Sequence, residues 1–191
     1  MPPSLTISHI SHGSEDTRSD LLNWNQGKLE DAAELQKVLL QDCIKVLGEE
    51  HLDTLSAMNN LALTYWYQGK LEDAAELQQI ELKESITALG EEYPNILCAM
   101  NNLALTYRDQ EKVEDAAELQ RAAVVVCEHL LGDMHPLTLE ALDNLGCIYQ
   151  LQERLEDSIK LLEKAMEGGK ECLGPEHPAT LLYSMNLAVS Y

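Results

Sequence analysis

One block of sequence recurs along this chain at a constant spacing. It begins at Leu47, returns at Leu89 and Leu131, and starts again at Leu173, so that each start lies 42 residues after the previous one. A period of this length, kept without insertions, is typical of proteins built from stacked units that each pack mainly on their neighbours. The repeat therefore limits the fold more strongly than any other feature of the sequence.

Two apolar stripes in each copy predict a pair of helices. The first stripe follows the period of one helix face, and in one copy it consists of Leu97, Met100, Leu103, Ala104 and Tyr107. The second stripe runs through Val113, Ala116, Ala123, Val124, Cys127 and Leu131. We expect antiparallel helix pairs over residues 53–67 and 71–88, 95–109 and 113–130, and 137–151 and 155–172.

Glycine and proline mark the ends of these predicted helices. A Gln-Gly pair at Gly27 and again at Gly69 predicts a turn between the first and the second helix of a copy. A glycine also follows the last apolar residue of each second helix, where a left-handed residue commonly closes a helix. These glycines are Gly48, Gly90, Gly132 and Gly174, and a proline opens the next helix at Pro94, Pro136 and Pro178.

The fold class expected from this pattern is all-α, an α-solenoid in which helical hairpins form a right-handed superhelix with a concave groove. We expect an irregular lead-in over residues 1–20 and repeats over 21–191. The repeats divide into a partial copy at 21–46, whole copies at 47–88, 89–130 and 131–172, and a partial copy at 173–191. The last copy stops after a first helix, so we expect the array to continue in a longer protein.

Charge and composition argue against several classes of function. The formal net charge is −20, which repels nucleic-acid phosphate and anionic lipid headgroups. No apolar run approaches the roughly 20 residues that a membrane-spanning helix needs, and the start of the chain does not resemble a leader peptide. Five widely spaced cysteines without a CxxC pair indicate free thiols in a reducing compartment. We therefore expect a cytoplasmic protein.

The motifs of the repeat resemble those of a known family. Gly-x-x-His-Pro, Asn-Asn-Leu-Ala-x-x-Tyr, Gln-Gly-Lys and Glu-Asp-Ala follow one another as in tetratricopeptide repeats of the 42-residue kind, which are similar to the cargo-binding domain of kinesin light chains. The motif Asp-Thr-Leu-x-Ala-Met-x-Asn-Leu-Ala-x-Thr-Tyr also resembles repeat regions of fungal NB-ARC and NACHT receptor-like proteins. The resemblance implies a scaffold that binds a protein or peptide, in such a receptor or, alternatively, in a kinesin light-chain-like cargo adaptor.

The resemblance also implies which residues line the groove. In kinesin light chains the first Asn of the Asn-Asn pair holds the backbone of an extended peptide, and the matching residues here are Asn59 and Asn101, with Asp143 and Met185 in later copies. Our candidate groove set is Asn59, Leu63, Trp66, Asn101, Leu105, Arg108, Asp143 and Gln150. Arg108 is the only positive charge at the matching inner positions, whereas the light-chain groove is basic. An alternative is that Asn59 and Asn101 only tie neighbouring helices together.

Other polar residues have structural and functional interpretations. His51, His135 and His177 recur with the repeat and are expected to pack the turns between copies. Acidic pairs begin each second helix, where they complement the helix dipole, and they form either a solvated face or a docking site for a basic partner. These pairs are Glu30-Asp31, Glu72-Asp73, Glu114-Asp115 and Glu156-Asp157. Trp24 and Trp66 fit the groove and the core equally well.

The sequence contains no recognisable arrangement for chemistry. His9 and His12 could share a helical turn, but no third ligand follows at helical spacing. No nucleotide-binding or zinc-protease motif is present, and each cysteine falls at a repeat position. We expect no enzyme activity, no metal and no cofactor, and neither nucleic acid nor membrane as a partner. The sequence does not indicate an oligomeric state.

Overall fold

A computed structural model describes residues 15–89 and 94–191, and the side chains of residues 27–88 and 96–191. The described residues form eight helices and no strand, which confirms the all-α prediction. The helices are α1 (Glu15–Leu47), α2 (Leu52–Tyr67), α3 (Leu71–Leu89), α4 (Pro94–Asp109), α5 (Val113–Leu131), α6 (Pro136–Leu151), α7 (Leu155–Cys172) and α8 (Pro178–Val189). The bounds of α2 to α7 agree with the predicted ranges to within one residue at either end.

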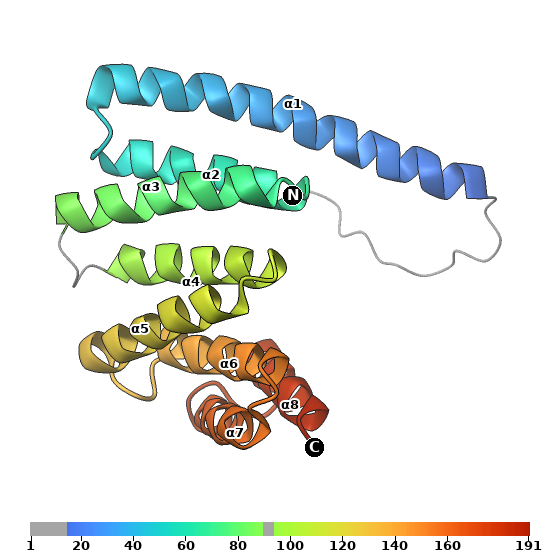
Figure 1. Ribbon diagram of the computed structural model, residues 1–191, viewed down its shortest axis with the longest axis vertical. Coiled ribbons are helices and arrows are strands. Elements are labelled where there is room, and N and C mark those ends of the chain that lie inside the picture. Colours follow the sequence, from blue (N-terminus) through green and yellow to red (C-terminus); the bar gives the residue numbers. More distant parts are fainter. Residues whose placement is uncertain (1–14, 90–93) are drawn as a thin grey trace.

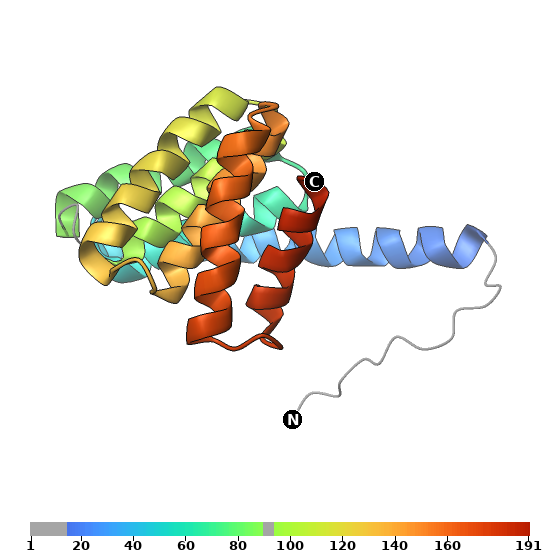
Figure 2. The ribbon, with the colours of Figure 1, turned by 90° about the horizontal axis from the view of Figure 1, so that it is seen from below.

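The helices stack in chain order. Each helix packs on those before and after it, and the first helices α4, α6 and α8 also contact one another in sequence. Figure 1 shows the stack from α1 at the top to α7 and α8 at the bottom, and Figure 2 shows α1 projecting beyond the other helices. Because contacts join only neighbouring copies, the arrangement is that of a solenoid.

The predicted stripes form the core between the helices of a pair. In the third whole copy Leu139, Leu142, Leu145 and Tyr149 are all buried. Gly146 lies where α6 crosses α7, and a Cβ atom at this position would be 2.6 Å from Cγ of Leu162. The recurrence of a small residue at this place, Ala62, Ala104 and Gly146, therefore reflects the close approach of two helices.

Residues with positive φ close the helices at the predicted turns that the structure describes, except at Gly27, and Gly90 lies outside the described residues. Gly132 has φ 86° and ends α5, while Gly69 has φ 73° and separates α2 from α3. The two later copies replace Gly69 with Glu111 and Glu153, which adopt φ 62° and 59°. The turn geometry is thus the same in all three copies, although glycine occupies it only once.

The predicted turn at Gly27 is wrong, because Gly27 lies inside the continuous helix α1. The positions that match the buried stripe of α2 are Gly13, Asp16, Ser19 and Asp20, so this first copy lacks an apolar first helix. Without a stripe to bury, there is no packing energy to favour a hairpin, and a helix tolerates one glycine at a cost of about 1 kcal/mol. Residues 15–20 of the expected lead-in also belong to α1, and 1–14 lie outside the described residues.

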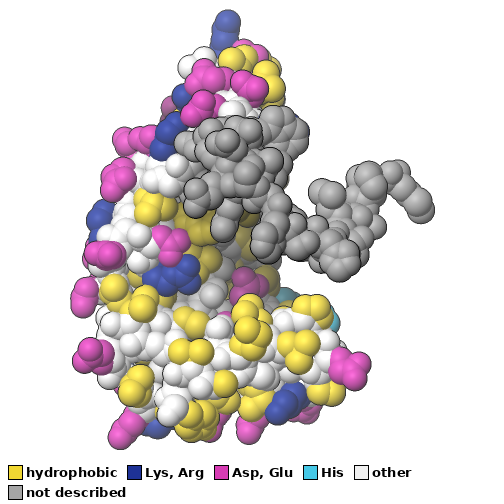
Figure 3. Space-filling model, turned by 90° about the vertical axis from the view of Figure 1, so that its right-hand side faces the viewer, with side chains coloured by type: hydrophobic (Ala, Val, Ile, Leu, Met, Phe, Trp, Pro, Cys, Tyr) yellow, Lys and Arg dark blue, Asp and Glu magenta, His cyan; other side chains and the backbone are white. Residues whose placement is uncertain are grey.

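Figure 3 shows the side of the stack where α2, α4 and α6 end. Acidic side chains are scattered along its edges, and hydrophobic side chains gather over the lower part, where Figure 1 places α6 to α8. Exposed apolar residues of these helices are Leu151, Leu155, Leu181, Leu182, Met185 and Val189, and Tyr191 follows α8.

Candidate functional site

The candidate groove residues lie on one side of the first helices, beside the buried stripe. We call this surface the first-helix face; it comprises Ser56, Asn59, Leu63 and Trp66 on α2, Cys98, Asn101, Leu105 and Arg108 on α4, and Glu140, Asp143, Cys147 and Gln150 on α6. Ser56, Cys98 and Glu140 are exposed, and the others are half-buried except Asp143, which is buried. The face therefore offers both polar and apolar groups to a ligand.

A ladder of amide hydrogen bonds crosses this face from copy to copy. Asn102 donates to Oδ1 of Asn59 at 3.0 Å, and Asn144 donates to Oδ1 of Asn101 at 2.7 Å. The next rung keeps the pattern, with Asn186 donating to Oδ2 of Asp143 at 2.8 Å. Asn102, Asn144 and Asn186 thus each bind the residue that lies 43 positions earlier, on the first helix of the preceding copy. These contacts support the alternative in which Asn59 and Asn101 tie neighbouring helices together, and their role in holding a peptide stays a prediction.

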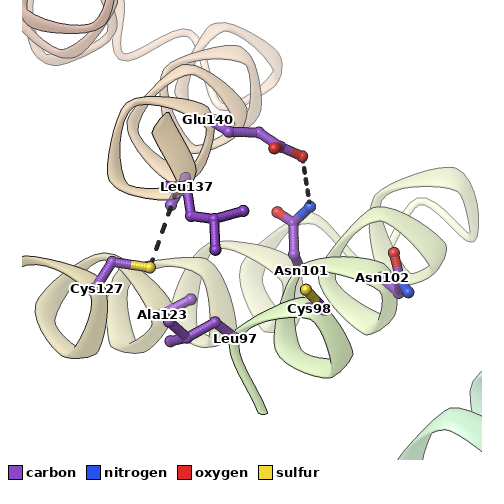
Figure 4. Close-up of a pocket in the computed structure, with 9 residues that line it drawn as sticks. Leu97, Cys98, Asn101, Asn102, Ala123, Cys127, Leu137 and Glu140 are labelled. Carbon is purple, nitrogen blue, oxygen red and sulfur yellow. Dashed lines mark hydrogen bonds between the residues drawn. The ribbon is translucent and has the colours of Figure 1, made fainter. Parts of the chain in front are cut away.

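Asn101 is the most connected residue of the ladder. Its Oδ1 also accepts a hydrogen bond of 3.1 Å from the buried Gln120 on α5, and its Nδ2 donates to Glu140 at 3.3 Å. Figure 4 shows Asn101 and Glu140 pointing toward each other across a pocket that Asn102 also lines. Asn101 therefore fixes α4 against α5 and α6.

Trp66 and Arg108 meet at one carboxylate. Nε1 of Trp66 donates to Oδ2 of Asp109 at 2.9 Å, and the Arg108 guanidinium binds Oδ1 of the same residue at 2.9 and 2.8 Å. Trp66 is half-buried, so its indole makes a contact between copies and is also partly accessible to solvent. Arg108, the predicted anchoring charge, is neutralised by its neighbour Asp109. Further along, Gln150 donates to the carbonyl of Asn186 at 2.9 Å and so joins α6 to α8.

Two pockets open between consecutive first helices. The α4–α6 pocket has a volume of about 130 Å³ and is lined by Leu97, Cys98, Asn101, Asn102, Ala123, Cys127, Leu137, Glu140 and Ala141. The α2–α4 pocket has a volume of about 220 Å³ and is lined by Leu52, Leu55, Ser56, Asn59, Glu81, Ser85, Cys98 and Ala99. Most lining positions of one pocket lie one repeat from those of the other, so the pockets form a row along the face.

Burial perturbs the acids of this region. Burial raises the pKa of Glu81 to about 7, and the hydrogen bond from Ser85 only partly offsets this effect. Burial also raises the pKa of Asp143 to about 6, with a smaller contribution from Glu140 and an opposing one from the Asn186 hydrogen bond. Partial desolvation of the Cys98 sulfur raises the pKa of this thiol, and the carboxylates of Glu140 and Glu81 raise it further. The linings of the two pockets contain carboxylates and no Lys or Arg.

The remaining sequence predictions concern the ends of the helices. His51, His135 and His177 each accept a hydrogen bond through Nδ1 from the backbone N–H two residues later, at 3.2 Å, so they cap α2, α6 and α8. The acidic pairs Glu72-Asp73, Glu114-Asp115 and Glu156-Asp157 lie in the first turns of α3, α5 and α7. All five cysteines are free. His9, His12 and the side chain of Trp24 lie outside what the structure describes.

Sequence reasoning missed Glu81 and Gln120. Both lie on second helices, whereas the search for groove residues followed the first helices. A comparison of the copies contains a signal for Glu81, because the equivalent residues are Ala123 and Ala165. A carboxylate at a position that is otherwise a buried alanine is unusual. Gln120 is fully buried and bridges Asn101 to the carbonyl of Ala141.

Within the described residues, no helix has both the length and the apolar character needed to span a membrane. No group of three potential metal ligands gathers there either.

The comparisons with known proteins agree with this architecture. The family model of the tetratricopeptide repeat matches residues 19–79 and 95–168. A search of curated protein sequences gives no significant match. Among solved structures, the chain is similar to the nearly identical TPR-like repeats of a candidate kinesin light chain from Podospora anserina, with 27% identity, a TM-score of 0.75 and coverage of 92% of this chain and 84% of that one.

Two further structures are similar. A single-substitution variant of the same Podospora anserina repeats has 26% identity, a TM-score of 0.77 and the same coverage of 92% and 84%. BtubC (BKLC) from P. vanneervenii has 23% identity and a TM-score of 0.77, over 89% of this chain and 68% of that one. At this last level of identity the likeness concerns the fold alone.

Proposed function

Because this chain belongs to the tetratricopeptide repeat family, we propose that it holds a peptide or protein partner along the first-helix face. Repeats of this kind generally mediate protein–protein interaction, and solenoids bind through extended surfaces built from equivalent positions of successive repeats. We further propose that the array is the recognition region of a larger cytoplasmic protein. It is proposed to act as a scaffold and not as an enzyme.

The observation that supports this proposal most directly is the row of pockets. Asparagine and leucine side chains line two openings whose linings repeat from one copy to the next, and the half-buried Trp66 lies further along the same face. An extended peptide has alternating groups at a regular spacing, and a periodic surface that mixes amides with apolar contacts fits such a ligand. The ladder keeps the first helices in a fixed register, which lowers the entropy lost on binding.

Two settings for the array fit different observations. The sequence motif of the repeat favours the sensor region of a fungal-type nucleotide-binding receptor. The similarity to the repeats of a candidate kinesin light chain favours a cargo adaptor. The electrostatics of the first-helix face argue against a ligand as acidic as those of light chains. Glu140 and Asp143 lie on the face and Glu81 lines the α2–α4 pocket beside it, while Arg108 is already paired. We therefore place the receptor setting first.

A photo-crosslinking experiment tests where the partner binds. A photoreactive phenylalanine analogue is introduced at Ser56, which is exposed on the first-helix face, or at Glu114, which is exposed in the acidic first turn of α5. The two variants are irradiated in cells and the crosslinked proteins are identified by mass spectrometry. We expect a defined partner to be captured from Ser56 and not from Glu114. Capture from Glu114 alone would show that the partner binds at the acidic first turns of the second helices.

A further inference from the structure

The α2–α4 pocket contains a carboxyl group at a position where the α4–α6 pocket, one repeat later, has an alanine. Glu81 on α3 is only 7% exposed, and the residues one and two repeats later are the buried Ala123 and Ala165. Ser85, one turn further along α3, likewise stands where later copies have Cys127 and Gly169. The second helix of this copy has therefore exchanged two small apolar contacts for a polar pair.

The carboxyl group of Glu81 is incompletely satisfied within the protein. Its Oε1 accepts a hydrogen bond from Ser85 at 3.4 Å, which is long for a hydroxyl donor. Its Oε2 is buried and has no hydrogen-bond partner among the described residues. A buried acceptor without a partner is unfavourable and is usually retained where a ligand or another group completes it.

The lining of the pocket indicates which group could complete it. From α2 come the apolar Leu55 and the polar but uncharged Ser56 and Asn59. From α4 comes the Cys98 thiol, whose surroundings are made more negative by Glu140 on α6. On α3 itself, Glu84 is paired with Lys83 at 3.1 Å. The described residues around the pocket thus offer oxygen acceptors and an apolar wall.

We propose that the α2–α4 pocket binds the ammonium group of a lysine side chain of the partner, with Glu81 as its counter-ion. An ammonium carries three donors, which match Oε2 of Glu81 and the oxygens of Ser56 and Asn59. A guanidinium prefers two parallel acceptor oxygens, and here only one carboxylate oxygen is free. The four-carbon stem of lysine would lie against Leu52 and Leu55. The net charge of −20 attracts a basic partner over longer distances.

This lysine site extends the proposed function and rests on it, because the partner must lie along the first-helix face. It is tested without the partner, by titrating the full chain with n-butylammonium and following the side-chain amide of Asn59 by NMR. Binding requires the ionised carboxylate, and the pKa of Glu81 near 7 makes its ionised fraction rise about tenfold between pH 6 and pH 8. We expect the affinity for n-butylammonium to rise by about the same factor.

Matched probes and variants define the outcome. n-Butanol, which has the same stem without the charge, should not shift Asn59. Glu81→Gln and Glu81→Ala should abolish binding of n-butylammonium, and the alanines at the equivalent positions indicate that the second variant still folds. Glu84→Gln removes one charge from the same helix outside the pocket and should change the affinity less than about twofold.

Binding that is absent at pH 8, independent of pH, or unchanged in Glu81→Gln would overturn the proposal and leave Glu81 as a partner of Ser85 alone. These results are distinguishable from failure of the proposed function, which would appear as capture of the partner from Glu114 and not from Ser56. If n-butylammonium binds but the partner is captured only from Glu114, the pocket binds amines without serving the partner, and the assignment to a partner lysine is wrong.

Discussion

Asn144 donates a hydrogen bond of 2.7 Å to the side-chain oxygen of Asn101, which lies on the preceding first helix. The same relationship joins Asn102 to Asn59 and Asn186 to Asp143. A residue that looks suited to hold a peptide backbone is thus already engaged by the next copy. The ladder sets the register of the first helices, and the surface that the partner meets depends on it.

We predict that Asn101→Ala destabilises the protein. The change removes the acceptor of Asn144 and one of the two acceptors of the buried Gln120, at a cost of about 1–3 kcal/mol in the free energy of unfolding. Chemical denaturation followed by circular dichroism measures this effect. Asn60→Ala is the control, because Asn60 is exposed and its loss should change the stability by less than about 0.5 kcal/mol. Equal effects of the two changes would show that the ladder does not stabilise the stack.

Asp143→Asn should stabilise the protein at high pH. Asp143 is buried at the position that Asn59 and Asn101 occupy in the two preceding copies, and burial raises its pKa from 3.8 to about 6. Because folding raises the pKa of this carboxyl group, the protonated group favours the folded state, and this stability is fully present below the pKa of the unfolded chain. The stability is lost as the pH rises through about 6, where the buried group ionises. We expect a gain of about 1–3 kcal/mol at pH 8 that shrinks toward pH 4. Denaturation curves at the two pH values test this, and a gain that is the same at both would contradict the assignment.

Glu111→Gly should also stabilise the protein. Glu111 holds the left-handed turn between α4 and α5 at φ 62°, which glycine adopts without steric cost. The relief of strain exceeds the added flexibility of the unfolded chain, so we expect a gain of about 0.5–1 kcal/mol. The reverse change, Gly69→Ala, places a side chain at φ 73° and should destabilise by about 1 kcal/mol. Thermal unfolding of both variants checks the sign, and a loss of stability in Glu111→Gly would refute the argument.

His135→Ala removes the cap of α6. Nδ1 of His135 accepts the backbone N–H of Leu137 at 3.2 Å, and losing an N-cap acceptor costs about 0.5–2 kcal/mol. Urea denaturation of His135→Ala measures the loss, and His135→Asn, which keeps a capping oxygen, should recover most of it. If asparagine is no better than alanine, the histidine acts through packing in the turn.

The fold could be predicted because the same helix pattern occurs in several copies of the repeat. The glycines and prolines at equivalent positions predicted the bounds of α2 to α7 to within one residue. The turn at Gly27 was wrong because the prediction followed the local Gln-Gly signal, while tertiary packing decided the outcome. With Asp16 and Asp20 in the place of buried residues, the first copy has no stripe to pack.

The candidate site was predicted less completely for a physical reason. Helical periodicity identifies which residues share a face, so it grouped Asn59 with Leu63 and Trp66. It does not show which side chains satisfy each other between copies, and the bonds from Asn102 to Asn59 and from Trp66 to Asp109 depend on how the helices stack. Glu81 was missed because it reaches the pocket from a second helix.

The reactivity of two cysteines shows whether the partner lies along the first-helix face. Cys98 and Cys172 are both exposed, but Cys98 lines both pockets while Cys172 lies at the end of α7. Their alkylation by N-ethylmaleimide is followed by mass spectrometry with and without the partner captured from Ser56. With that partner at about ten times its Kd, the rate at Cys98 should fall about tenfold and the rate at Cys172 should not change. An unchanged rate at Cys98 with the partner bound would show that the partner binds away from the first-helix face.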